Sequence, residues 1–305
     1  MEIFLPIAHL DVNLLMILAF GISIGGLSAL TGVGGGFLLT PLLMIIGVPP
    51  LMAVGTTPAL IAGSAAAGSY SHWRLGNMDL RLGFALLLGS WSTAIAAIFA
   101  TRILEKGGHF DTIVVFTYVT ILGTVGSVTF VEAIRSVFLG PKAATAHAVT
   151  PAAAGPLSWL PGQMEFKVAQ RRMSVVLPLL LGAFIGLLNA LGMGGGFVAV
   201  PAMIYLLRLP TKVAIGTSLL LMVATSVVVS TMQAGVNHSV DPILALTLII
   251  GSALGANWGA RMSSILPGER LRLLLALILL AVAIKFLFDL LVTPAEFYSL
   301  VGVGS

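Results

Sequence analysis

The sequence predicts an all-α, polytopic membrane protein built from two related halves. Of its 305 residues, 58% are hydrophobic and 9% are charged. A soluble domain carries about 25% charged residues, so most of this chain is unsuited to contact with water. Apolar stretches of about 20 residues recur along it, each long enough to cross a hydrocarbon core of about 30 Å.

Clusters of Gly, Pro and charged residues separate ten apolar segments. We expect them at about 13–31, 36–48, 51–70, 80–102, 111–131, 173–192, 196–208, 213–235, 241–262 and 270–290. The segments at 36–48 and 196–208 are short, because about 13 residues of helix extend only about 20 Å. Each of these two either crosses a thinned region or enters the membrane and returns.

The basic residues discriminate between these two topologies, because cytoplasmic loops concentrate Lys and Arg. If all ten segments cross, three of the 15 basic residues (Arg102, Lys106 and Lys285) lie on one side, which leaves 15 − 3 = 12 on the other. If the short segments re-enter, the same 15 residues divide 8 against 7. The charge distribution therefore favours ten crossings, with both termini outside.

A long connection at residues 132–172 divides the chain. It contains Pro141, Pro151, Pro156 and Pro161 among alanines and charges, which is typical of an irregular linker. We expect a first transmembrane repeat at 1–131, a cytoplasmic linker at 132–172 and a second repeat at 173–305. The linker is expected to act as a tether, and a regulatory role is the alternative.

The two halves contain matching sequence blocks. TGVGGGFLLTP at 31–41 matches LGMGGGFVAVP at 191–201, and VGTT at 54–57 matches IGTS at 215–218. Asp79, Gly89 and Ser90 match Asp241, Gly251 and Ser252. Five spans is an odd number, so the second copy enters the membrane upside down relative to the first. Inverted repeats are common in secondary transporters, whose sites lie between the halves.

Glycine clusters stand beside both short segments and are candidate substrate-binding sites. They are Gly32, Gly34, Gly35 and Gly36, and Gly192, Gly194, Gly195 and Gly196. Glycine weakens a helix, so the backbone there is expected to be broken or closely approached. A helix restarting at Phe37 or Phe197 would present unpaired N–H groups that bind oxyanions. The alternative is that the glycines serve close helix packing alone.

Hydroxyl-bearing residues form a second candidate element. Pro58 lacks an N–H group, so Thr57 is expected to cap a helix restarting there. The hydroxyls of Thr56 and Thr57, and of Thr217 and Ser218 in the second half, would then reach a substrate oxygen. Hydrogen bonding between helices is the alternative role.

Polar residues within or beside the spans are candidates for a proton or polar relay: His72, Asn189, Gln233 and Asn257. His72 could carry a coupling proton, since histidine titrates near physiological pH. An interfacial histidine bonded to a loop is the alternative. Gln233 stands where the first copy has His72, so a histidine pair across the halves is absent.

Several functional classes lack support. The chain has no cysteine and no HExxH, Walker or GxSxG pattern, so no metal site, cofactor or enzyme activity is expected. The net charge of +4 is explained by membrane topology, so nucleic acid is not an expected partner.

Four sets of motifs together resemble the sulfite exporter TauE/SafE family, also known as the toluene-sulfonate uptake permease family. They are the GGGF pair, the GTT and GTS elements, HWRLGNMD at 72–79 and VDPILALTLIIGSALGANWGARM at 240–262. The resemblance covers about 14–131 and 165–288. It implies a permease for a small sulfur-containing anion, such as sulfite, sulfoacetate or a related organosulfonate, in a bacterial inner membrane. It also implies functional roles for the two glycine clusters, the GTT and GTS hydroxyls and His72.

The sequence thus predicts a secondary-type anion permease in a lipid bilayer, with a proton as a possible coupling ion and no prediction of oligomeric state. A passive anion channel and a permease for another small carboxylate or oxyanion are the alternatives. A membrane enzyme is a third option, although no His, Glu or Asp cluster supports it.

Overall fold

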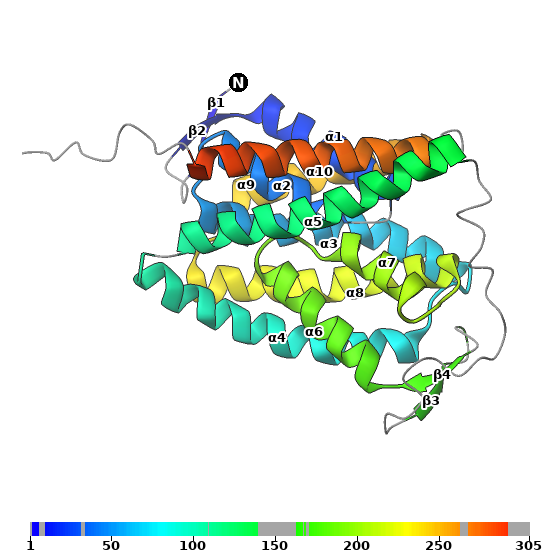
Figure 1. Cartoon of the computed structure of the whole chain (residues 1–305). Helices are drawn as coiled ribbons and strands as arrows, with labels where there is room; N and C mark the ends of the chain where they lie inside the picture. Colours follow the sequence, from blue (N-terminus) through cyan, green and yellow to red (C-terminus); the bar gives the residue numbers. More distant parts are fainter. Residues whose placement is uncertain are drawn as a thin grey trace, which may run out of the picture.

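The computed structural model (Figure 1) describes residues 2–5, 10–31, 34–108, 110–139, 163–166, 168, 171–262 and 268–291. Within these residues the chain forms ten α-helices. The first half contains α1 (Leu14–Thr31), α2 (Gly36–Ile45), α3 (Pro50–Arg74), α4 (Leu80–Lys106) and α5 (Phe110–Leu139). The second half contains α6 (Val176–Ala190), α7 (Gly196–Tyr205), α8 (Thr211–Met232), α9 (Pro242–Met262) and α10 (Gly268–Leu291).

All ten apolar segments are helical, as the sequence predicts. A single π-helical turn, η1 (Gln233–Asn237), continues α8. Two short hairpins that the sequence analysis did not expect flank the helices. They pair β1 (Glu2–Leu5) with β2 (Leu10–Asn13), and β3 (Gln163–Phe166) with β4 (Arg171–Ser174). Helix α5 continues to Leu139, so the first residues of the predicted linker are helical, while residues 140–162 of it lie outside the described part of the chain.

Within the described residues, five helices are long and apolar enough to cross a bilayer: α3, α4, most of α5, α8 with η1, and most of α9. The short helices α2 and α7 have 10 residues each, which is about 15 Å of helix and half of a hydrocarbon core. Strand β1 and the last turn of α10 lie at one end of the bundle, and the β3–β4 hairpin lies at the other (Figure 1). The membrane topology and the inverted orientation of the repeats stay predictions.

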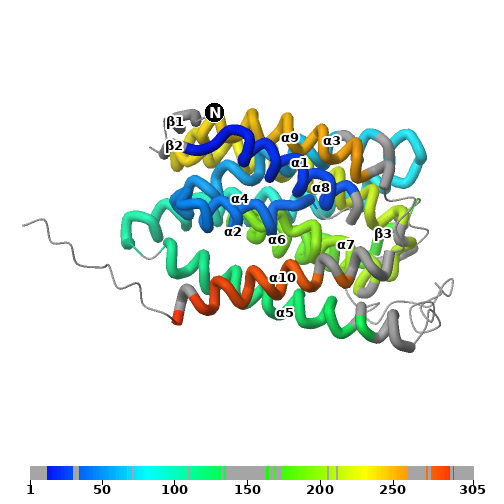
Figure 2. The backbone as a smooth tube through the Cα atoms, turned by 90° about the horizontal axis from the view of Figure 1, so that it is seen from above, coloured from blue at the N-terminus to red at the C-terminus, as the bar shows by residue number. Residues whose placement is uncertain are grey.

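Helices of the first half pack mainly against helices of the second. The main pairs are α1 with α9, α4 with α6, α3 with α8, and α5 with α10. Figure 2 shows α5 and α10 side by side along one edge, with α1 and α9 along the other. Glycines permit the closest approaches, since a Cβ on Gly255 would collide with the carbonyl of Ile22, and one on Gly182 with that of Leu86. The GxxxG face of α9, formed by Gly251, Gly255 and Gly259, therefore serves helix packing.

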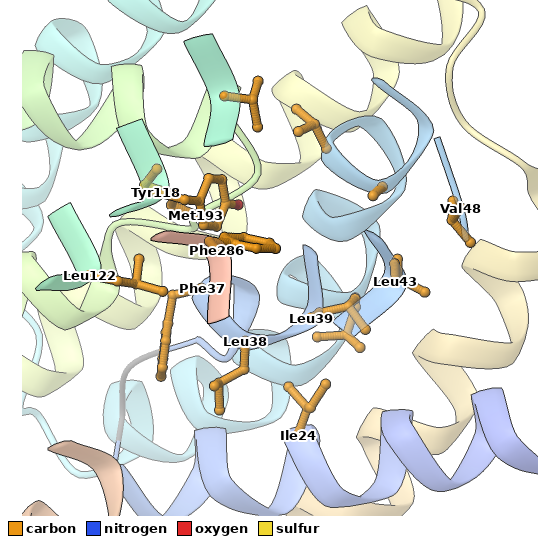
Figure 3. Packing of buried hydrophobic residues seen from close by; sticks show 14 of the residues in the cluster. Ile24, Phe37, Leu38, Leu39, Leu43, Val48, Tyr118, Leu122, Met193 and Phe286 are labelled. Carbon is orange, nitrogen blue, oxygen red and sulfur yellow. The ribbon is translucent and has the colours of Figure 1, made fainter. Parts of the chain in front are cut away.

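The short helix α2 lies in the protein core. Seven of its 10 residues are buried, so its interrupted backbone is enclosed by protein rather than lipid. The rings of Phe37 on α2 and Phe197 on α7 have centroids 5.3 Å apart. Tyr118 and Met193 lie close to Phe286 in the same cluster (Figure 3), and the Tyr118 ring meets that of Phe286 edge-on at 6.1 Å. This packing places the start of both short helices deep in the bundle.

Candidate functional site

The glycine clusters adopt backbone conformations that other residues rarely take. Gly34 and Gly35 have φ of 86° and 68°, and Gly194 and Gly195 have φ of 80° and 60°. In this left-handed region a residue with a Cβ is strained by about 1–2 kcal/mol. The helix breaks predicted from the glycines are therefore confirmed in both halves, while Gly32 lies outside the described residues.

Each break ends at the N-terminus of a short helix. Helix α2 begins at Gly36 and α7 at Gly196, one residue earlier than the predicted restarts. The capping residues Gly35 and Gly195 have no side chain to accept a hydrogen bond. The first N–H groups of a helix have no acceptor inside it and form the positive end of the helix dipole.

These two helix ends meet at the centre of the protein. A Cβ built on Gly194 would lie 3.6 Å from Cα of Gly36, and one built on Gly36 would lie 3.1 Å from the carbonyl oxygen of Gly192. The two glycine clusters are thus in contact, although about 160 residues separate them. The arrangement brings two positive helix ends, one from each half, to one place.

The carbonyl groups of the second break are bonded by side chains from three other elements. The carbonyls of residues 190, 191 and 192 accept hydrogen bonds from Gln233 Nε2 (3.2 Å), Tyr118 Oη (3.1 Å) and Thr40 Oγ1 (3.0 Å). The negative ends of these peptides are therefore already paired. The N–H groups of residues 191–193 are bonded to carbonyls of α6, so the N–H groups that remain to suit an anion are those at the start of α7.

The predicted helix break at Pro58 is wrong, because α3 runs without interruption from Pro50 to Arg74. Thr57 does not cap a helix, and its hydroxyl donates instead to the carbonyl of Ala53 at 2.8 Å. The hydroxyl of Thr57, immediately before Pro58, thus adds a bond within the helix beside the position where the proline lacks an N–H. The Thr57 hydroxyl also lies 2.8 Å from Thr40 Oγ1, so it belongs to the bonded chain that reaches Gly192.

Thr56 and Thr217 occupy matching positions across the halves. The hydroxyl of Thr56 accepts a hydrogen bond from the backbone N–H of Asp241 at 3.4 Å, and that of Thr217 accepts one from Asp79 at 3.2 Å. Each aspartate caps the helix that follows it, α9 and α4 respectively. These two hydroxyls therefore hydrogen-bond to the helix-capping residues of the opposite half. Ser218 donates within its own helix, to the carbonyl of Ile215 at 2.9 Å.

The structure brings only two of the four candidate relay residues near one break. Asn189 is fully buried and exchanges hydrogen bonds with Ser226. It directly precedes Ala190, whose carbonyl accepts a hydrogen bond from Gln233. Asn257 is exposed and bonds the carbonyl of Ala253 in its own helix. No hydrogen bond among the described residues joins His72 to the other three, and its Nδ1 is buried without a partner there.

Sequence reasoning missed two pairs of residues at the breaks. Ile61 on α3 and Met222 on α8 are fully buried against the glycine clusters. The repeat offset of 161 pairs them with each other, and this signal could have found them. Thr40 and Tyr118 were also missed, because the side chains at the matching positions of the other half cannot donate hydrogen bonds. Val200 matches Thr40, and an apolar stretch at 278–280 matches Tyr118.

Among the residues that the structure describes, no group of three or more His, Asp or Glu side chains could hold a metal ion. The chain contains no cysteine. The polar groups that hydrogen-bond at the second break are hydroxyls, an amide and backbone carbonyls.

Comparison with known proteins identifies the family. A family model described as Sulfite exporter TauE/SafE matches residues 17–286. The probable membrane transporter protein YjnA of Bacillus subtilis is 29% identical over 276 residues, which cover 89% of this chain and 98% of that protein. The probable membrane transporter protein YunE of the same organism is 20% identical over 91% of this chain and 98% of its own length.

A probable membrane transporter protein of Xylella fastidiosa is 37% identical over 95 residues, which are 30% of this chain and 36% of that protein. No solved structure gives a significant match. The family model covers both halves and both glycine breaks, and the full-length relatives carry the name of membrane transporters. The chain is a multi-pass membrane transporter and belongs to the sulfite exporter TauE/SafE family.

Proposed function

We propose that the protein is a secondary-type permease that moves a small sulfur-containing anion across the bacterial inner membrane. The anion binds between the glycine-flanked starts of α2 and α7. The main support for this proposal is the contact between Gly36 and Gly194, which brings together two helix N-termini from different halves. A site at the contact of two halves can open to either side when the halves move relative to each other.

Backbone N–H groups at a helix start bind oxyanions without a full positive charge. Three carbonyls of the second break are already bonded by Gln233, Tyr118 and Thr40, so they do not repel an anion there. A sulfite or sulfonate group offers three oxygens, which suits convergent N–H donors. It stays a prediction that four hydroxyls contact the anion directly, namely those of Thr56, Thr57, Thr217 and Ser218.

The substrate class rests on the family description, which names sulfite export, and on the resemblance that adds sulfoacetate and related organosulfonates. A small carboxylate or another oxyanion has the same recognition chemistry and is the alternative substrate class. A proton is the proposed coupling ion. His72 is its candidate carrier, because its Nδ1 is buried and lacks a hydrogen-bond partner among the described groups.

Flux measurements in proteoliposomes test the site. Gly35→Ala places a Cβ 2.6 Å from Ile24 Cγ2 at the helix start, and we expect it to abolish sulfite and sulfoacetate flux. Gly76→Ala is the matched control. Gly76 has the same φ of 68° but nothing within 4 Å, so this variant carries the backbone strain without the contact. Gly35→Leu and Gly195→Leu extend the test, and unchanged flux in folded forms of both would remove the proposed site.

A passive anion channel is the rival mechanism. A carrier saturates with substrate, and its uptake rises when the opposite side holds a counter-substrate. A channel shows neither dependence. Sulfite uptake that is linear in concentration and insensitive to trapped sulfite would contradict the secondary-type mechanism while leaving the anion site in place.

A further inference from the structure

We propose that Ile61, assisted by Met222, sets the size of the anion that fits between the two glycine-flanked helix ends. This inference rests on the proposed function.

Ile61 touches both glycine clusters at once. Its Cδ1 lies 2.5 Å from where a Cβ on Gly36 would sit and 2.8 Å from the equivalent point on Gly194. Its Cγ2 lies 3.5 Å from that point on Gly34. One terminal methyl group therefore fills the space beside the starts of both short helices, where an anion would have to reach the N–H groups.

Met222 occupies the matching position in the second half. Its Cγ and Sδ both lie 3.8 Å from a Cβ built on Gly34. Like Ile61 it is fully buried. The two side chains project from α3 and α8, which pack against each other, one from each repeat. The pair thus forms an apolar wall shared by the two halves.

The methyl group of Ile61 must withdraw before an anion can bind, and it then borders the bound anion. The space that opens is set by the volume of this side chain, because protein interiors are close-packed. One methylene group in an apolar pocket changes discrimination by about 10–200-fold. Removing the terminal methyl should therefore favour larger anions over small ones.

The variant Ile61→Val tests this directly, because it deletes only Cδ1 and costs about 0.5–1.5 kcal/mol of stability. The readout is the ratio of toluene-sulfonate flux to sulfite flux in proteoliposomes. We expect this ratio to rise about tenfold in Ile61→Val and further in Ile61→Ala. Met222→Ala should raise it less, because methionine is flexible and its contact with Gly34 is looser.

Ile98→Val is the control, since Ile98 on α4 is also fully buried but lies in a separate apolar cluster between α4, α6 and α8. It should leave the ratio unchanged. An unchanged ratio in Ile61→Val, or an equal rise in Ile98→Val, would overturn the inference. If the proposed function itself is wrong, the result differs. The wild-type protein then moves none of the anions, or the Gly35→Ala variant retains full flux.

Discussion

The hydroxyl of Thr40 lies 3.0 Å from the carbonyl oxygen of Gly192, which ties α2 of the first half to the glycine break of the second. The same hydroxyl is 2.8 Å from Thr57 Oγ1 on α3. All of these groups are buried, so the bond is shielded from water. This single side chain therefore fixes the relative position of the two breaks.

Replacing Thr40 with valine, the residue at the matching position 200, should destabilise the protein by about 1–3 kcal/mol, because it leaves the buried Gly192 carbonyl unpaired. Thermal unfolding in detergent measures this effect. Thr40→Ser keeps the hydroxyl and should recover most of the lost stability. Equal unfolding temperatures for Thr40→Val and the wild type would contradict the assigned bond.

Gln233→Leu should destabilise the protein by more than Asn257→Leu. Gln233 is fully buried, donates to the Ala190 carbonyl and accepts from Asn237 and Ser239, so its loss leaves that carbonyl unpaired and removes one bond from each of the two donors. Asn257 is exposed and bonds only its own helix among the described contacts, so its replacement should stay within about 0.5 kcal/mol. Unfolding in detergent compares the two variants, and equal effects would argue against the anchoring role of Gln233.

Gly182→Ala should disrupt the contact between α6 and α4. The added Cβ would collide with the backbone carbonyl of Leu86, which cannot move without shifting its helix. We expect loss of the monodisperse peak in size-exclusion chromatography. Gly123→Ala on α5 meets nothing within 4 Å and serves as the control. A well-folded Gly182→Ala protein would show that the two helices can separate at low cost.

Asp79→Ala and Asp241→Ala should have similar effects, because the side chain of each caps a helix and the backbone N–H of each donates to a threonine hydroxyl of the other half. Loss of an aspartate cap costs about 0.5–2 kcal/mol. Thr217→Val and Thr56→Val remove the other bond at each cap, whose donor is the backbone N–H that alanine retains. Thermal unfolding of the double variants should therefore show losses close to the sum of the single losses, and a double variant no less stable than either single variant would contradict separate contributions of cap and hydroxyl.

Much of the fold was predictable, because the relevant signals are local. The lengths of the apolar segments matched the helices to within a few residues, with α5 as the main exception. The glycine clusters located both helix breaks, since left-handed backbone at Gly35 and Gly195 requires residues without a Cβ. The prediction of a break at Pro58 was wrong, because it rested on the local chemistry of proline, while surrounding helices keep α3 continuous.

The candidate site was predictable only in part. The repeat pointed to the glycines and the GTT and GTS elements, but it could not indicate which hydroxyls were engaged in helix caps. Thr40 and Tyr118 have no polar counterpart in the other half, so the repeat gave no signal for them. Ile61 appeared as one apolar residue among many within a membrane span.

The sequence by itself determined that this chain is a membrane protein of two repeats with a glycine break in each, because hydrophobic length and backbone freedom are properties of short contiguous segments. Only the tertiary structure decided that the breaks touch and that Thr40 bonds Gly192, 152 residues away. It also decided that Ile61 fills the space between the helix ends. These relationships depend on how α3, α6 and α8 pack together, and no single segment carries that information.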